Sequence, residues 1–294
     1  MTRRIARLAG LLTILACLAL AACAPAAITA RQAFQQTPAT IRVDGADMAY
    51  HVLGAEGSGE PLLMLMGYAG TMDVWDPDLV DALAAQRRVI LMDNRGMGFS
   101  TATDEPLTMT RMTRDAAALL DALGIRQADV MGWSMGTAVA QELALDRPGL
   151  VRSLVLYGPT CEPGPVMPVL DEFAALSSEQ FLARLFPEPW AQAHPDAYSR
   201  LPAPVRPTEP AMIGRQYMAI KQWDGTVDRL PGLGIPTLLV VGDADDVTPP
   251  EQAERMAGLL PDARLALLPG GGHWAMYQFP GHMARLILEF LDRY

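Results

Sequence analysis

Basic residues are scarce in this chain and do not cluster anywhere. Its 294 residues include 23 Lys and Arg against 33 Asp and Glu, for a formal net charge of −10, and Lys221 is the single lysine. A face that binds nucleic acid needs clustered positive charge. The composition therefore argues against a nucleic-acid partner. Hydrophobic residues make up 50% of the chain and charged ones 19%, so we expect a folded protein with a sizeable core.

Cysteine and histidine are also rare. Cys17 and Cys23 lie in or beside an apolar N-terminal run, which leaves Cys161 without a partner in the rest of the chain. An intramolecular disulfide framework is thereby excluded, and Cys161 is expected to be a small buried hydrophobe. No group of Cys and His has the spacing of a zinc site. We therefore expect neither a metal nor a cofactor.

Residues 1–22 have the pattern of a secretory signal peptide. Three arginines precede an uncharged apolar run, 8–22, which is shorter than the roughly 20 apolar residues that a membrane-spanning helix needs. The run ends in Leu-Ala-Ala-Cys (20–23), which resembles the lipobox of bacterial lipoproteins. This resemblance implies cleavage before Cys23, a lipid on its thiol, and an extracytoplasmic protein anchored to a membrane of the bacterial cell envelope. Ordinary secretion is the alternative. Residues 23–38 are expected to form a tether.

From residue 39 onward, strand patterns alternate with helical ones. Asp44-Gly45 predicts a hairpin between strands 40–43 and 48–53. Further strands are expected at 61–66, 88–92, 130–131, 153–157, 236–241 and 263–268, with helices near 77–86, 112–123, 135–146, 250–260 and 283–291. This alternation predicts an α/β fold with a mostly parallel central sheet and helices on both faces. The core is assigned to residues 39–160 and 225–294.

The alternation stops in residues 161–224, which contain ten prolines. One short helix is expected after Ser177, where Ser177-x-x-Gln180 resembles a capping box, and another at 211–223. An insertion of proline-broken helices late in the sheet predicts a small helical cap over a site. A packed insert that never contacts a substrate is the alternative.

The stretch Gly132-Trp133-Ser134-Met135-Gly136 sits between a strand and a helix, the context of a nucleophile elbow. A serine on so tight a turn adopts strained backbone angles that expose its hydroxyl. The residues two before and two after it crowd together, which favours glycine at both. Ser134 is therefore the candidate nucleophile.

A serine nucleophile needs a base, usually histidine, held by a carboxylate. Of the four histidines, His273 follows a glycine run just after a buried strand, where it could reach Ser134. His51 lies in an early strand, His194 in the expected cap and His282 at the start of the last helix. His273 is the candidate base.

The carboxylate is expected between serine and histidine in the chain. Residues 238–249 form a strand that ends in an acidic loop with three aspartates. Spacing favours Asp245; Asp246 is the alternative, and Asp243 is expected to organise the turn.

Taken together, these motifs resemble the α/β-hydrolase superfamily, in its branch of small capped esterases and lactonases. The resemblance rests on Gly67, on Asp93-x-Arg95-Gly96-x-Gly98-x-Ser100, and on the elbow, acid-loop and histidine motifs in the expected order. It implies an oxyanion hole made by the backbone N–H groups of Tyr68 and Met135. Relatives commonly have His-Gly where this chain has Met66-Gly67, so the positioning of that loop is open. The Asp93 turn is expected to be structural.

The function expected from these residues is hydrolysis of a carboxylic ester or lactone through an acyl-enzyme. The small-molecule substrate is expected to be hydrophobic because the cap is apolar. Cofactor-free haloperoxidase (perhydrolase), carbon–carbon bond hydrolase and aminopeptidase chemistry remain alternatives on the same triad, as does a non-catalytic binding lipoprotein. Trp133 and Trp274 could line the pocket or pack in the core. An aminopeptidase would need acids in the cap, and the candidates are Glu162, Asp171, Glu172, Glu179 and Glu188.

Overall fold

The computed structural model describes residues 28–54, 59–173 and 175–294. The expected signal peptide and the lipid-attachment residue Cys23 lie outside these ranges. Within them, no helix combines the length and the apolar character needed to cross a membrane.

The described residues form one eight-stranded sheet in the order β1-β2-β4-β3-β5-β6-β7-β8. Its strands are β1 (Ala39–Val43), β2 (Ala46–Leu53), β3 (Leu62–Leu65), β4 (Val89–Met92), β5 (Ala128–Trp133), β6 (Val151–Tyr157), β7 (Thr237–Gly242) and β8 (Ala263–Leu268). β2 pairs antiparallel with β1 and β4, and the remaining neighbours pair in parallel. β3, β4, β5 and β7 are buried along their whole length, as expected for parallel strands covered on both faces.

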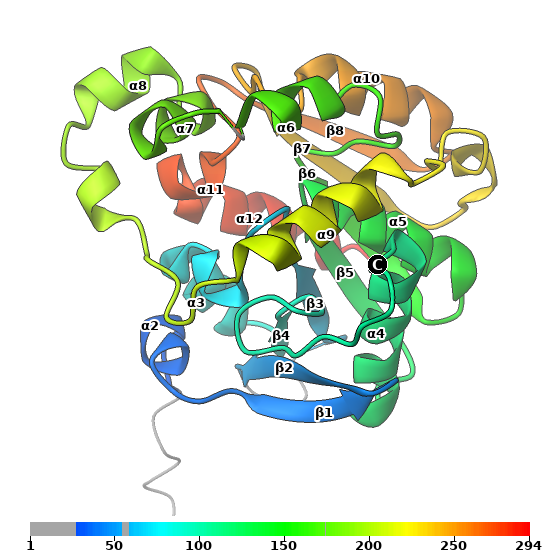
Figure 1. Cartoon of the computed structure of the whole chain (residues 1–294). Helices are drawn as coiled ribbons and strands as arrows, with labels where there is room; N and C mark the ends of the chain where they lie inside the picture. Colours follow the sequence, from blue (N-terminus) through cyan, green and yellow to red (C-terminus); the bar gives the residue numbers. More distant parts are fainter. Residues whose placement is uncertain (1–27, 55–58, 174) are drawn as a thin grey trace, which may run out of the picture.

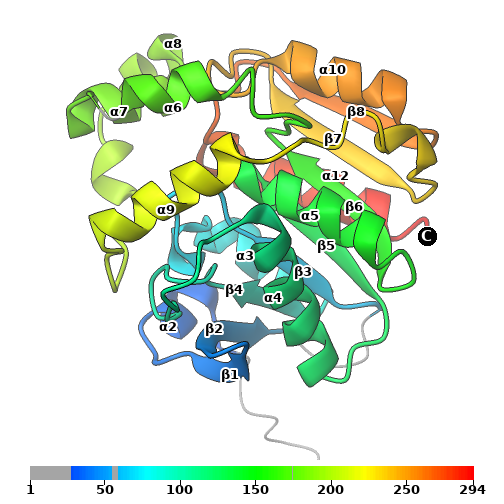
Figure 2. The same ribbon diagram turned by 45° about the vertical axis from the view of Figure 1, so that its right-hand side comes forward.

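Helices cover both faces of the sheet, as Figures 1 and 2 show. On one face, α4 (Met109–Ala122), α5 (Met135–Asp146) and α10 (Pro250–Leu259) contribute to one buried apolar cluster. On the other, α3 (Pro77–Ala84), α11 (Ala275–Gln278) and α12 (Pro280–Leu291) contribute to a second. Short 3-10 turns lie at Met72–Val74, Tyr198–Arg200 and Leu230–Gly232. The α/β architecture predicted from the alternation is confirmed.

The expected tether at 23–38 is wrong in its described part. Residues Ala30–Phe34 form a helix, α2, with a capping box at Thr29. Ala30, Ala33 and Phe34 are buried, and the Ala30 N–H donates to Asp81 on α3 (2.6 Å). Burial of three apolar side chains on one side of a capped turn docks this segment on the core. A loose linker would leave them in water.

Between β6 and β7 the chain leaves the sheet and forms α6 (Met167–Phe173), α7 (Ser178–Leu185), α8 (Glu188–Ala193) and α9 (Pro210–Lys221). The capping box at Ser177 is present as predicted. Pro210 occupies the first turn of α9, where its missing N–H is not needed. Figures 1 and 2 show these helices over the edge of the sheet where the parallel strands end.

Candidate active site

Ser134 lies on the sharp turn between β5 and α5, with φ 52° and ψ −121°. Such angles are rare and strained for a residue with a side chain. The two flanking glycines are required by close backbone approach. A Cβ on Gly136 would lie 2.2 Å from the Leu65 carbonyl oxygen, and one on Gly132 would lie 2.3 Å from the Gly136 carbonyl oxygen. The turn thus has the crowded geometry that the motif predicts.

His273 and Asp245 are brought together by the loops after β8 and β7. The Nδ1 of His273 lies 2.9 Å from Asp245 Oδ2 and 3.2 Å from Oδ1. Both side chains are almost completely buried. Asp245 Oδ1 also accepts the backbone N–H groups of Val247 and Thr248 (2.9 Å each), and Oδ2 accepts the Thr248 hydroxyl (3.0 Å). This set of donors fixes the carboxylate and orients the imidazole through Nδ1.

The other two aspartates of the acid loop do not contact the histidine ring. Asp243 is exposed, and its Oδ1 accepts the Gly270 N–H (2.7 Å). It therefore ties the acid loop to the histidine loop, in keeping with the predicted role in the turn. Asp246 points to solvent. Of the three candidates, the structure brings Asp245 to His273.

The other histidines lie elsewhere. His51 is on β2, opposite Leu91 of β4, and burial lowers its pKa while Asp73 opposes that shift. His194 is exposed and stacks on Trp190. His282 is exposed on α12. None of the three lines the cavity that contains His273 and Ser134.

Sequence reasoning missed the groups that hold the backbone of His273. Its carbonyl oxygen accepts the Tyr157 hydroxyl (2.6 Å) and the Trp133 indole N–H (3.2 Å). Burial raises the pKa of Tyr157 well above its ordinary value, so the phenol stays a neutral donor. Tyr157 is the last residue of β6, at the carboxyl edge of the sheet. That position in the sequence could have indicated that Tyr157 lies near the site.

The two predicted oxyanion donors belong to residues next to the elbow: Met135 follows Ser134, and Tyr68 follows Gly67. Met135 opens α5, where backbone N–H groups are free of intrahelical partners. Tyr68 follows Gly67, on which a Cβ would come within 3.2 Å of the Ser134 Cβ. Among the described residues, neither the Tyr68 nor the Met135 N–H has a hydrogen-bond partner. An oxyanion hole needs backbone donors without a protein partner, and both N–H groups meet that condition.

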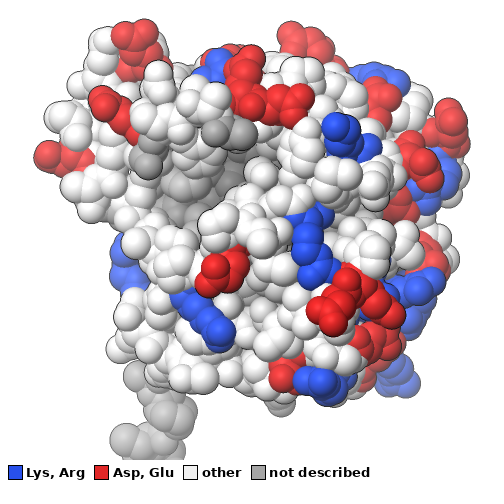
Figure 3. Space-filling view, viewed as in Figure 1, with Lys and Arg blue, Asp and Glu red and all other residues white. Residues whose placement is uncertain are grey.

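Ser134 and His273 open into one cavity of about 710 Å³ under the cap. Its lining is mainly apolar and aromatic: Tyr68, Ala69, Gly70, Val74, Trp133, Ser134, Leu170, Asp171, Phe173, Phe181, Leu185, Pro202, Pro204, Ile213, Gly214, Tyr217, Val247, His273 and Trp274. Both tryptophans considered above are in this set. Within the described ranges, no hydrogen bond joins the Ser134 hydroxyl to His273. Catalytic hydrogen bonds are often long or poorly aligned in a structure without substrate. Figure 3 shows mostly uncharged surface around the hollow between the upper cap helices and α9.

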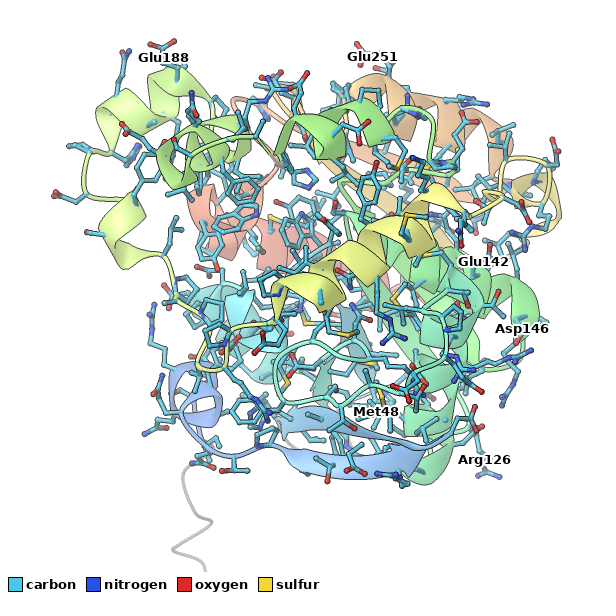
Figure 4. The ribbon with its side chains drawn as sticks, in the orientation of Figure 1. Met48, Arg126, Glu142, Asp146, Glu188 and Glu251 are labelled. Carbon is cyan, nitrogen blue, oxygen red and sulfur yellow. The ribbon has the colours of Figure 1, made fainter. Side chains whose placement is uncertain are left out.

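The acids of the cap are mostly turned away from this cavity. Asp171 is the one acid in the described lining, and its carboxylate accepts the Tyr217 hydroxyl (2.5 Å). The other four point elsewhere: Glu162 pairs with Arg255, Glu172 pairs with Arg184, and Glu179 and Glu188 are exposed. Figure 4 shows Glu188 at the outer end of the cap, pointing away from the molecule. The arrangement offers little to hold a substrate amine.

Two further predictions concern groups outside the cavity. Cys161 is fully buried and burial raises its pKa, as expected of an inert thiol.

The Asp93 carboxylate is buried beneath the site and accepts the N–H groups of Met72 (2.7 Å) and Phe99 (2.9 Å). Burial raises the pKa of Asp93 to about 7. Beside it, Arg95 and Asp115 form a fully buried ion pair. The described part of the chain contains no cluster of His, Cys, Asp and Glu that could hold a metal ion.

The sequence matches the family model of the α/β-hydrolase fold over residues 60–189 and 176–280. The protein named "Putative carbamate hydrolase RutD" of Azorhizobium caulinodans is 30% identical over 257 residues, which cover 83% of this chain and 95% of that protein. "Putative non-heme bromoperoxidase BpoC" of Mycobacterium tuberculosis is 30% identical over 253 residues, or 80% of this chain and 94% of that protein. The solved structure of an α/β-hydrolase fold protein from Chitinophaga pinensis superposes with a TM-score of 0.78 at 28% identity, covering 89% and 99% of the two chains.

Proposed function

Because this chain belongs to the α/β-hydrolase family and is a hydrolase, we propose that it cleaves a carboxylic ester or lactone with Ser134 as nucleophile. The observation that carries the proposal is the contact between His273 Nδ1 and the Asp245 carboxylate (2.9 Å), in the cavity that also contains the elbow serine. A buried carboxylate on Nδ1 favours the imidazole tautomer whose Nε2 is free to accept a proton.

The proposed reaction has two halves. His273 takes the proton of the Ser134 hydroxyl as its oxygen attacks the substrate carbonyl, and the N–H groups of Tyr68 and Met135 stabilise the oxyanion. The tetrahedral intermediate collapses to an acyl-enzyme, and His273 gives its proton to the departing alcohol. Water, deprotonated by the same imidazole, then attacks the acyl carbon. The bond to the Ser134 oxygen breaks, His273 returns its proton to that oxygen, and the acid is released. Asp245 stabilises the imidazolium in both halves.

The residues that line the cavity favour a neutral, apolar substrate. Its described lining contains no lysine or arginine, so a substrate carboxylate would find no cationic partner there. Aromatic and aliphatic side chains dominate its walls, and about 710 Å³ is in the range of pockets for small organic ligands. The cap acids, four of which lie outside the lining, give an aminopeptidase little support.

The test is a series of p-nitrophenyl esters from acetate to long acyl chains, with simple lactones alongside. Ser134→Ala is expected to lower kcat by about 10⁴-fold or more, because the reaction then lacks its nucleophile. Ser199→Ala, an exposed cap serine, is the matched control and is expected to behave as wild type. A fluorophosphonate probe should label the wild type and Ser199→Ala but not Ser134→Ala.

Retained ester cleavage in Ser134→Ala would overturn the assignment. Because one relative is named as a bromoperoxidase, halide oxidation with peroxide and a carboxylic acid is measured in the same series. Perhydrolysis faster than ester hydrolysis, and dependent on Ser134, would replace the proposed reaction while keeping the nucleophile.

A further inference from the structure

The loop that carries the Tyr68 N–H has little internal support. Among the described residues, the backbone hydrogen bond within the loop runs from the Gly70 N–H to the Gly67 carbonyl (3.3 Å). Ala69 lies in the left-handed region with φ 60°, although it has a side chain. Such a conformation persists only where surrounding contacts hold it.

Two side-chain amides hold this loop from outside. Asn94, in the turn beneath the site, donates from Nδ2 to the Met66 carbonyl (3.2 Å). Gln216, on cap helix α9, accepts the Ala69 N–H at its Oε1 (2.7 Å), a bond across 147 residues of sequence. The peptide between these two anchor points contains the Tyr68 N–H. Gln216 itself is fully buried.

Burying the Gln216 amide costs free energy, and the hydrogen bond from the Ala69 N–H explains why a glutamine is present at this position. Its Nε2 is buried and has no hydrogen-bond partner among the described residues. An unpartnered buried donor is unfavourable, so packing alone would favour an apolar side chain of the same length. The carboxamide is accounted for by its oxygen, which a methionine or leucine could not supply.

We propose that Gln216 is a positioning residue that sets the Tyr68 N–H for the oxyanion, and that it makes the hole depend on the seating of α9. This inference rests on the proposed ester or lactone hydrolysis. A cap helix that moves away takes the acceptor of Ala69 with it and releases the loop. The hole is then complete only when the cap is closed over the substrate.

The test uses two variants that lose the bond in different ways. Gln216→Met keeps the length and removes the acceptor, whereas Gln216→Asn keeps the carboxamide and is too short to reach Ala69. Met218→Gln is the matched control, because Met218 lies on the same helix and is 42% exposed, and so neither anchors α9 nor contacts the oxyanion loop. The measurements are kcat and KM on the best p-nitrophenyl ester, and inhibition by a trifluoromethyl ketone that forms an oxyanion on Ser134. Thermal unfolding identifies the variants that fold.

Both Gln216 variants are expected to lose about 10- to 100-fold in kcat, with KM within about threefold of wild type, because misplacement of one donor weakens transition-state binding selectively. Affinity for the ketone should fall by a similar factor. Met218→Gln should keep kcat within about threefold of wild type. Folded Gln216 variants with wild-type kcat would overturn the inference, as would an equal kcat loss in Met218→Gln. If Ser134→Ala is inactive and the Gln216 variants keep wild-type kcat, only the inference about Gln216 fails. If Ser134→Ala is active, the proposed function and the inference about Gln216 both fail.

Discussion

Asp245→Asn separates the electrostatic role of this carboxylate from its structural one. The two oxygens divide the work: Oδ1 accepts the Val247 and Thr248 N–H groups, and Oδ2 faces the Thr248 hydroxyl and, at 2.9 Å, His273 Nδ1. An asparagine can leave its oxygen on the backbone donors and place its amide where Oδ2 was. The acid loop should then keep its shape.

The catalytic loss should be large because the amide is a donor facing Nδ1. It favours the tautomer that carries its proton on Nε2, and that imidazole cannot accept the proton of Ser134. The imidazolium also loses its counter-charge. We expect kcat to fall by about 10⁴-fold, while the free energy of unfolding falls by only about 1–2 kcal/mol, the difference between charged and neutral hydrogen bonds.

The assay is p-nitrophenyl ester hydrolysis near pH 8, with urea unfolding of the same preparations. Asp246→Asn, at the exposed neighbouring aspartate, is the control and should stay within about twofold of wild-type kcat. If Asp245→Asn kept more than about a tenth of wild-type kcat while folding normally, the reasoning from tautomer and counter-charge would be refuted.

Two other outcomes concern stability. Gly136→Ala would place a Cβ 2.2 Å from the Leu65 carbonyl oxygen, so it should cost more than about 3 kcal/mol or prevent folding, whereas Gly149→Ala, with nothing within 4 Å, should be nearly neutral in urea unfolding. For Asp93, burial raises the pKa from 3.8 to about 7, so between these pH values the folded state holds a proton that the unfolded chain has released. Its stabilisation is complete below about pH 4 and is lost as the pH rises through about 7, and the free energy of unfolding should drop by about 1 kcal/mol from pH 6 to pH 8. Asp93→Asn should lack this share of the slope, and an unchanged slope would contradict the shift.

Much of the fold could be predicted because its signals are local. The apolar run at 61–66 and the one at 236–241 correspond to β3 and β7 within one or two residues, since strands covered on both faces need no polar alternation. Asp44 and Gly45 both have positive φ in the hairpin turn, which is the conformation that this dipeptide favours. The requirement at Gly132 is equally local, because its crowding atoms belong to Gly136 and Thr137, whereas Gly136 is crowded by the Leu65 carbonyl of β3.

Other features could not be read locally. The helix around Phe34 could not be predicted, because its burial depends on contacts with α3 and the sheet and not on its own residue pattern. The short helix α11, directly after His273, also went unpredicted. Cleavage at Cys23 and its lipid attachment stay predictions, since they concern residues outside the described ranges.

The sequence by itself determined the α/β class, singled out Ser134 and His273 as candidates, and placed the carboxylate in one acidic loop, because each of these depends on a short motif and on the order of motifs along the chain. Only the tertiary structure decided what surrounds them. Tyr157 reaches the His273 carbonyl across 116 residues and Gln216 reaches Ala69 across 147. These contacts are hydrogen bonds between single polar atoms of distant segments. They leave no periodicity or spacing in the sequence, and they exist only after the sheet and cap have brought the segments together.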